Sequence, residues 1–394
     1  MTPINLLIIA HNNLGTSLSG GDQIFLNIIK HAPSNFNITV VGSAETKALL
    51  TKYRATPTRF VLSAPTNSIS LTTFSLFLHQ LIRLFFALKF CFTHPLFFNQ
   101  FTTIYTASDF PSDSIFGVFS KLLNFKIRWI AGFYLFSPPP FSATSHYNQN
   151  HHFFRGILYY LGQLPVYYLV RLLAHTVAVT SDPDTLRFPH KNSLVIQGGV
   201  NLPKLTKSLH YPGYIPPPKR RFDALFIGRL HSQKGVLALV DIWQLVTKTN
   251  PHALLAIIGD GELKASLAQK IRVGQLDNNI ILLGFCIGKK AETIIKNSKI
   301  IVHPATFDSG GMAAAQAMAW GLPGVSYDLP ALKTYYPQGM LKTPCFNQTA
   351  FSENIISLLS DSSLYNRTSH QAITLTKEFW SWPYRLKPLY QIIV

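Results

Sequence analysis

The sequence contains few cysteines and few acidic residues. Cys91, Cys286 and Cys345 are its three cysteines among 394 residues, and no two of them have the spacing of a metal-ligand pair. An odd number of widely separated cysteines argues against a disulfide framework, so we expect a protein of the reducing cytosol. Asp and Glu number 17 against 35 Lys and Arg, and the formal net charge is +18. This excess favours a polyanionic partner or an anionic membrane surface.

Two classes of segment are missing from the sequence. The basic residues are scattered rather than clustered, and the basic-aromatic motifs typical of RNA- and DNA-binding modules are absent, so we expect no nucleic-acid partner. The first ten residues lack a basic n-region, and their apolar run is too short for a secretory signal. We therefore interpret Ile4–Ala10 as a strand and expect a cytoplasmic protein, with peripheral attachment to the cytosolic face of a membrane left open.

Residues 71–98 form a very apolar stretch that is interrupted by His79, Gln80, Arg83, Lys89 and His94. No window of about 20 residues is free of charge, which argues against a membrane-spanning helix. Apolar residues recur at helical spacing from Phe74 to Leu88. Two interpretations stay open: a helix whose apolar face packs into the core, or a helix on a membrane interface with Arg83 and Lys89 at lipid phosphates. The aromatic and basic stretch 153–179, which contains the helix-kinking Pro165, has the same two interpretations.

Apolar runs alternate with helical periods along most of the chain, which predicts parallel sheets covered by helices on both faces. Prolines and basic residues crowd residues 202–221, where apolar periodicity is absent, so we place an interdomain linker there. We expect an N-terminal Rossmann-like domain over 1–201 and a second one over 222–376. Residues 377–394 are predicted to form a C-terminal helix that packs back toward the N-terminal domain.

The segment 301–327 carries the strongest pattern in the sequence. An apolar strand ends at a proline, Asp308 and two glycines follow, and an alanine-rich helix then begins. Free backbone N–H groups at such a helix start bind anions and sugar hydroxyls. Upstream, Gly228-Arg229 and Lys234-Gly235 add two cations in the same half of the chain. Together these residues indicate a pocket for a nucleotide diphosphate that carries a sugar.

This half of the chain resembles the retaining glycosyltransferases of family four, also described as glycosyl transferases group 1. Four ordered motifs carry the resemblance: FIGRLHSQKGVLALVDIW, AIIGDGELKASL, ILLGF and IVHPATFDSGGMAAAQAMAWGLPGV. The resemblance is weaker at Ser19-Gly20-Gly21 and at Gly198-Gly199-Val200-Asn201. It implies the GT-B fold, in which two doubly wound Rossmann-like domains face each other across a cleft.

The resemblance also implies roles for single residues. Arg229 and Lys234 correspond to the cations that hold the donor diphosphate, where fixed positive charge stabilises the leaving group as the glycosidic bond breaks. Asp308 and Gln316 stand where the family has two glutamates, which contact the donor sugar and the ribose. Asp308 keeps the charge with about 1.5 Å less reach, whereas Gln316 keeps hydrogen bonding without the charge.

The glycine-rich positions complete the predicted donor site. Gly310, Gly311 and Met312 would present backbone N–H groups at the start of the alanine-rich helix, and glycine permits close approach of a ligand. Gly20 and Gly21 correspond to the family's loop that faces the diphosphate from the N-terminal domain. Asp182-Pro183-Asp184 resembles a metal-binding acid pair, but its place after an apolar strand favours a turn and helix cap.

The expected function is therefore transfer of a hexosyl group, with retention, from a UDP-, GDP- or ADP-sugar to a glycan or lipid-linked acceptor. We expect no cofactor and no metal, because Arg229 and Lys234 would neutralise the leaving diphosphate. No base that activates the acceptor is assigned. A non-catalytic nucleotide-sugar binder and a sugar-nucleotide epimerase remain alternatives, because Asp308 and Gln316 depart from the family pattern.

Overall fold

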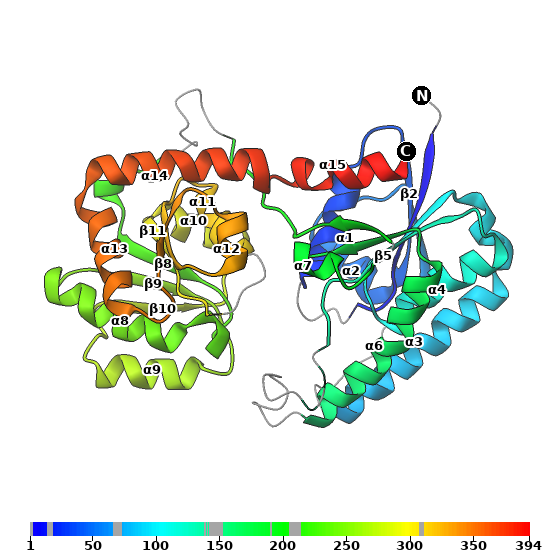
Figure 1. The fold of residues 1–394 in the computed structure, drawn as a ribbon, viewed down its shortest axis with the longest axis horizontal. Helices are drawn as coiled ribbons and strands as arrows, with labels where there is room; N and C mark the ends of the chain where they lie inside the picture. Colours follow the sequence, from blue (N-terminus) through cyan, green and yellow to red (C-terminus); the bar gives the residue numbers. More distant parts are fainter. Residues whose placement is uncertain are drawn as a thin grey trace. The chain divides into compact units, whose positions relative to one another are not determined.

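The computed structural model describes residues 3–13, 19–65, 73–137, 139, 141, 153–189, 191–204, 214–306 and 311–394. The chain divides into two compact units (Figure 1). Unit 1 comprises Met1–Gly198 and Arg385–Val394, and unit 2 comprises Gly199–Tyr384. The predicted domain limits and the 202–221 linker stay predictions, and residues 205–213 of that linker lie outside the described residues.

Unit 1 contains a seven-stranded parallel sheet with the order β3-β2-β1-β4-β5-β6-β7. The strands are β1 (Ile4–Ala10), β2 (Phe36–Ser43), β3 (Arg59–Ala64), β4 (Thr103–Thr106), β5 (Arg128–Gly132), β6 (Thr176–Val179) and β7 (Asn192–Val195). From β1 the strand order runs to β3 on one side and, from β4, to β7 on the other. Because the connections are right-handed, this reversal of strand order places helices on both faces of the sheet. Its helices are α1 (Gly20–Lys30), α2 (Ala44–Lys52), α3 (Thr73–Thr93), η1 (Pro95–Gln100), α4 (Pro111–Leu123), α6 (Phe153–Leu173) and α7 (Asp182–Thr185).

Unit 2 contains a six-stranded parallel sheet with the order β10-β9-β8-β11-β12-β13. The strands are β8 (Phe222–Ile227), β9 (Leu255–Ile258), β10 (Ile280–Gly284), β11 (Ser298–His303), β12 (Gly324–Tyr327) and β13 (Met340–Thr343). The helices are η2 (Pro217–Lys219), η3 (Ser232–Lys234), α8 (Val236–Thr249), α9 (Lys264–Val273), α10 (Gly288–Lys296), α11 (Met312–Met318), α12 (Pro330–Tyr335), α13 (Gln348–Ser360), α14 (Ser362–Leu375), η4 (Thr376–Trp380) and α15 (Trp382–Ile393). Helix α15 begins in unit 2, and its residues from Arg385 onward belong to unit 1.

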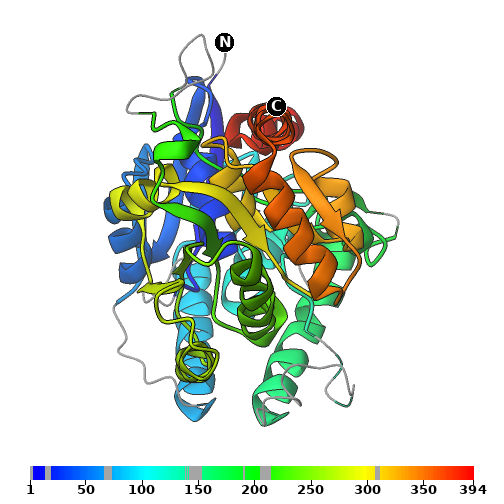
Figure 2. The ribbon, with the colours of Figure 1, turned by 90° about the vertical axis from the view of Figure 1, so that its left-hand side faces the viewer.

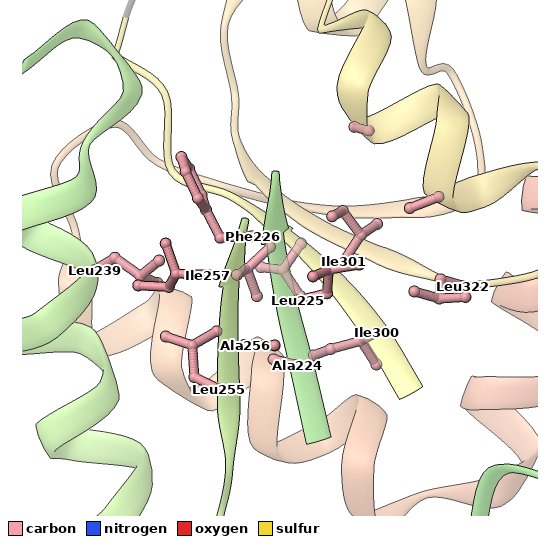
Figure 3. Close-up of a cluster of buried hydrophobic side chains, with 14 of the residues drawn as sticks. Ala224, Leu225, Phe226, Leu239, Leu255, Ala256, Ile257, Ile300, Ile301 and Leu322 are labelled. Atoms are coloured by element: carbon pink, nitrogen blue, oxygen red, sulfur yellow. The ribbon is translucent and has the colours of Figure 1, made fainter. Parts of the chain in front are cut away.

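The core of unit 2 is built on its central strand. Strand β8 lies between β9 and β11, and Leu225 of β8 is paired in register with Ala256 and Ile301 (Figure 3). These side chains are fully buried. Continuous apolar runs are typical of parallel strands that are covered on both faces. This core fixes the ends of β8 and β11, from which the predicted donor-site loops emerge.

Helix α3 contradicts one interpretation of residues 71–98 and one detail of the other. Its apolar stripe faces outward: Phe74 is 74% exposed and Phe85 is 62% exposed. The interpretation in which this stripe packs into the core is therefore wrong. Arg83 is 1% exposed and pairs with Glu45 of α2 at 2.5 Å, so it does not reach a lipid phosphate. Among the described residues, Phe74–Thr93 is the one helix segment with the length and composition of a membrane span, and 28% of its most apolar window is buried.

Candidate functional site

The loops that carry the two predicted cations emerge at the same edge of the unit 2 sheet. Strands β8 and β11 are parallel neighbours, so their carboxyl ends meet. Gly228 and Arg229 follow β8, and Pro304 follows β11. Ligands of doubly wound sheets bind outside the carboxyl ends of the strands. The described part of the predicted donor site therefore lies at the expected edge.

Lys234 is held beside the connection that leads from β11 to α11. It ends the short helix η3, and the next residue, Gly235, has a left-handed φ of 66°. A Cβ on Gly235 would lie 2.0 Å from the carbonyl oxygen of Pro304, so only glycine fits there. The N–H of Thr306 donates to the carbonyl of Gln233 at 3.0 Å. These contacts bring Lys234, which is half-buried, next to the segment that enters residues 307–310.

The loop that contains Arg229 packs against the turn after β9. A Cβ on Gly259 would lie 1.9 Å from the carbonyl oxygen of Gly228, and the N–H of Leu230 donates to the carbonyl of Asp260 at 2.9 Å. The Arg229 side chain itself is exposed. The Cγ of Lys234 is 3.9 Å from the position of a Cβ on Gly228, so the lysine stem passes beside the residue that precedes Arg229. The structure therefore brings the two cations into one loop region.

The start of helix α11 is fixed by Tyr336. Gly311 precedes the helix with a left-handed φ of 60° and is buried. The hydroxyl of Tyr336 donates to the carbonyl of Gly311 at 2.6 Å and accepts from the N–H of Ala315 at 3.1 Å. Met312 is half-buried and Gln316 is exposed. Tyr336 follows a short apolar stretch without a distinct motif, so sequence reasoning did not find it.

Asp308 and Gly310, two of the predicted site residues, lie outside the described residues, so their roles stay predictions. The described neighbours, Thr306 before the gap and Gly311 after it, connect this segment to the Lys234 loop and to α11 respectively.

Gly20 and Gly21 form the first turn of helix α1 in unit 1. Ser19 caps this helix, and the Asp22 carboxylate accepts from the N–H of Ser19 at 2.8 Å in a reciprocal capping box. A Cβ on Gly21 would lie 3.3 Å from the carbonyl oxygen of Ala107 and from the ring of Tyr134, whereas a Cβ on Gly20 would meet nothing within 4 Å. A side chain at position 21 would therefore crowd the residues that follow β4 and β5.

A buried carboxyl group that sequence reasoning missed lies at the same edge of the unit 1 sheet. Asp113 accepts from the N–H groups of His11 and Asn12, each at 2.8 Å, and from the hydroxyl of Ser108 at 2.5 Å. Burial raises the pKa of Asp113 to about 7, against the opposing effect of these hydrogen bonds. The signal in the sequence is weak: an aspartate at the start of a helix, shortly after an apolar strand.

Asp109 is a second buried carboxyl group nearby. It accepts from the amide of Gln163 at 2.6 Å and from the hydroxyl of Tyr159 at 3.0 Å. Burial raises the pKa of Asp109. Burial likewise raises the pKa of Asp22, which accepts from the amide of Asn13 at 2.7 Å. Polar side chains with perturbed pKa values at a sheet edge are typical of binding and catalytic sites, and of buried structural networks as well.

The Asp182-Pro183-Asp184 segment is a turn and helix start, as the sequence predicts. It forms the short helix α7, and the hydroxyl of Ser181 donates to the Asp184 carboxylate at 2.5 Å. Within the described ranges, no group of three or more His, Cys, Asp or Glu side chains has an arrangement that could hold a metal ion.

Comparison with known proteins connects unit 2 to one enzyme family. Residues 214–374 match the family model described as Glycosyl transferases group 1. The poly(glycerol-phosphate) alpha-glucosyltransferase of Bacillus subtilis is 27% identical over 172 residues, which cover 43% of this chain and 25% of that protein. The phosphatidyl-myo-inositol mannosyltransferase of Mycobacterium leprae is 26% identical over 180 residues, which cover 45% and 46%. The chain thus matches between about a quarter and a half of the length of these curated relatives.

Solved structures resemble the whole chain. The crystal structure of Anabaena HepE in complex with UDP and glucose has a TM-score of 0.69 and 15% identity, and the alignment covers 99% of each chain. The crystal structure of TarM has a TM-score of 0.69 and 12% identity, covering 100% of this chain and 99% of that one. Identities this low show the fold alone. The predicted fold class, two doubly wound Rossmann-like domains of the GT-B type, is confirmed.

Proposed function

We propose that this chain is a glycosyltransferase that moves a hexosyl group from a nucleotide-diphosphate sugar to an acceptor, with retention and without a metal ion. The observation that carries the proposal is the position of Lys234. Gly235 and Thr306 hold this lysine beside the β11–α11 connection, within the segment that matches the glycosyltransferase family. A fixed cation at that place suits the negative charge of a departing diphosphate.

The proposed roles follow the order in which the reaction proceeds. Arg229 and Lys234 hold the diphosphate, and Asp308 orients the donor sugar through its hydroxyl groups. Gln316 hydrogen-bonds the ribose, while the N–H groups of Gly310, Gly311 and Met312 contact the sugar or phosphate. Gly20 and Gly21, in the first turn of α1, would contribute to donor binding from unit 1.

The chemical step needs no protein nucleophile. The acceptor hydroxyl oxygen bonds to the anomeric carbon on the face from which the diphosphate leaves, and the bond between that carbon and the phosphate oxygen breaks. The proton of the acceptor hydroxyl passes to the departing phosphate oxygen. Retention follows because attack and departure use the same face. The positive charge of Arg229 and Lys234 lowers the energy of the transition state by stabilising the oxygen that gains charge.

The relatives favour a particular donor and class of acceptor. HepE was solved with UDP and glucose, so a UDP-hexose is the first donor to test. Two relatives are named for acceptors or products that contain phosphate: poly(glycerol-phosphate) and phosphatidyl-myo-inositol. Together with the net charge of +18, these names support an acceptor that carries phosphate, either a glycan polymer or a lipid-linked glycan.

A donor screen followed by product analysis tests the proposal. Thermal-shift measurements with UDP-, GDP- and ADP-sugars identify the donor, and release of the nucleoside diphosphate is then measured with and without phosphate-containing acceptors. We expect slow donor hydrolysis alone, faster release with an acceptor, and a product whose anomeric configuration by NMR equals that of the donor. Binding without any release would replace the proposal by a nucleotide-sugar binder, and a changed sugar still attached to the nucleotide would replace it by an epimerase.

A further inference from the structure

Helix α3 has the opposite polarity to that of an ordinary surface helix. Its inner side carries Arg83 and His79, each 1% exposed, together with Ala87 and Cys91. The Nε of Arg83 donates to His79 at 3.4 Å, and its guanidinium pairs with Glu45. The outer side carries apolar residues that recur at helical spacing: Phe74, Phe77, Leu78, Leu81, Phe85 and Phe92, each between 41% and 74% exposed. A helix that buries Arg83 and exposes four phenylalanines is suited to an apolar medium outside it.

Helix α6 repeats this pattern. Phe154, Leu158, Leu161, Tyr168 and Leu172 recur at intervals of three, four or seven residues and are between 38% and 76% exposed. Its inner side carries Gln163, Val166 and Val170, which are buried. The exposed stripes of both helices run from near the first turn to near the last, a length of about 27 Å each at 1.5 Å per residue. We call the exposed side chains of these two stripes the α3–α6 face.

The two stripes belong to helices that are neighbours in unit 1. Helix α3 contacts both α4 and α6, and both long helices extend beyond the sheet in the same direction (Figures 1 and 2). At the other end of α3, the ring of Phe92 lies 5.4 Å from that of Phe119 of α4. Exposed Leu122 and Phe125 follow in the chain, 73% and 74% exposed. Large apolar side chains are therefore exposed on α3, on α6 and at the end of α4, which is more than single scattered residues.

The charges around this face have one sign. No Asp or Glu occurs between Glu45 and Asp109, or between Asp113 and Asp182, so neither α3 nor α6 contains an acidic residue. Lys89 follows Phe85 by four residues and precedes Phe92 by three, which places it on the exposed side of α3. Lys89, Arg171 and Lys126 are exposed. An apolar surface that is accompanied by cations alone is complementary to an anionic lipid interface.

We propose that the α3–α6 face docks on the surface of an anionic phospholipid bilayer, with its phenylalanines and leucines among the upper acyl chains. The helices lie on the membrane and do not span it, because the inner side of α3 is occupied by the Arg83–Glu45 pair and by the core around Ala87 and Phe90. A second copy of the chain suits the face less well. A symmetric dimer would bring Lys89 and Arg171 of both copies together without an acidic partner.

Flotation of the purified chain with lipid vesicles tests this proposal. We expect wild-type protein to float with vesicles of phosphatidylcholine mixed with the anionic lipid phosphatidylglycerol. Binding should weaken with pure phosphatidylcholine and at high salt, because the cations contribute through screened attraction. The double variant Phe74→Glu with Phe154→Glu should bind at least about tenfold more weakly, since each substitution removes a buried aromatic side chain from the lipid.

A matched control separates this face from a general effect of charge. Leu186→Glu with Val273→Glu makes the same two changes of charge at side chains that are 80% and 78% exposed, but outside the α3–α6 face. This control should float as the wild type does. Equal flotation of both double variants, or no flotation of the wild type with anionic vesicles, overturns the proposal.

A second measurement reports insertion directly. The single substitution Phe74→Trp should give tryptophan fluorescence that brominated lipids quench, beyond the quenching of the wild-type protein. If light scattering instead shows a wild-type dimer that the Phe74→Glu, Phe154→Glu variant dissociates, without lipid quenching, the face is an interface between copies and the proposal is wrong. The docking proposal stands apart from the proposed transferase activity, because flotation does not require turnover and donor hydrolysis does not require vesicles.

Discussion

At the scale of single residues, Lys234 provides the sharpest test of the proposed chemistry. Replacing it with alanine removes the cation that Gly235 and Thr306 hold beside the β11–α11 connection. We expect Lys234→Ala to lower kcat by about 100-fold or more, the scale seen when one group that stabilises developing charge is removed. Initial-rate measurements of nucleoside diphosphate release give this value.

Lys248→Ala is the matched control, because it removes the same charge from the exposed far end of α8. Its rate should equal that of the wild type. A Lys234→Ala enzyme with near-normal kcat and unchanged stability would contradict the role proposed for this lysine.

The raised pKa of Asp113 predicts a specific dependence of the unfolding free energy on pH. The folded pKa is about 7 and the ordinary value is 3.8, so between these pH values the folded protein holds a proton that the unfolded chain has released. This carboxyl group therefore makes the protein less stable as the pH rises through that window. Asp113→Asn keeps an oxygen that accepts from the N–H groups of His11 and Asn12 and cannot ionise. Relative to wild type, the variant should gain roughly 2 kcal/mol of unfolding free energy between pH 5 and pH 8.

Urea denaturation of both proteins at pH 5 and pH 8 measures this difference. Asp277→Asn, at an exposed position, removes an equal charge and should show no such change with pH. A difference between Asp113→Asn and wild type that is the same at both pH values would show that Asp113 is ionised in the folded protein at pH 5.

The sequence predicts some of these residues and not others for a physical reason. Arg229, Lys234 and Gly235 stand in one short segment, where the spacing of glycines and cations carries the signal. Asp113 and Asp109 take their character from distant partners, such as the N–H of His11 and the amide of Gln163, which only the fold brings near. Asp308, the acid that the resemblance makes central, lies outside the described residues, so the donor-sugar contact rests on the sequence alone.

At the scale of secondary-structure elements, α3 shows what the periodicity of apolar residues can and cannot predict. The interval of three or four residues predicts the helix correctly, yet it does not say which side of the helix faces the core. An apolar stripe normally faces inward. In α3 the position of Glu45, on a different helix, favours burial of Arg83 and turns the phenylalanines outward. The spacing of residues within one helix carries no information about an ion pair with another helix.

The Arg83–Glu45 pair gives a prediction for this element. Glu45→Gln leaves the guanidinium buried between α2 and α3 without a counter-charge, and such a loss typically costs 3–5 kcal/mol. We expect a decrease of about 3 kcal/mol in the unfolding free energy, measured by urea denaturation. The double variant Glu45→Gln with Arg83→Met removes both charges and should recover part of that loss.

Glu353→Gln on α13 is the control, since it removes an exposed carboxylate and should leave stability within about 0.5 kcal/mol of wild type. If Glu45→Gln is equally mild, the pair does not determine which side of α3 is buried.

At the scale of the whole molecule, the alternation of strands and helices predicts two doubly wound domains, and the comparisons confirm that fold class. Ile4–Ala10 forms β1 with the limits that its apolar run predicts, because a strand buried on both faces has a continuous apolar sequence. Three edge strands, β3, β7 and β13, give a weaker signal. Each contains polar or exposed residues, such as Arg59 and Asn192, since an edge strand is covered less completely.

The end of the chain provides the last prediction. Residues Arg385–Val394 belong to unit 1 although unit 2 precedes them in the sequence. Leu386, Leu389 and Ile393 are at most 1% exposed, and the hydroxyl of Tyr390 donates to the carbonyl of Ile28 at 2.8 Å. Arg128 donates to the carbonyls of Ile392 and Ile393, at 2.9 and 2.7 Å. This segment therefore covers unit 1 and satisfies a half-buried guanidinium there.

Truncation after Tyr384 should destabilise unit 1 selectively. Each of the three buried aliphatic side chains contributes about 1.5–3 kcal/mol, so the loss amounts to several kcal/mol. Hydrogen exchange followed by mass spectrometry distinguishes the units, because it reports protection peptide by peptide. Peptides from β1, β4 and β5 should exchange faster in the truncated chain, and those from β8, β9 and β11 should keep their wild-type rates. Loss of protection throughout both sheets would mean that the units fold as one cooperative body, whereas unchanged protection in unit 1 would show that this segment contributes nothing to its stability.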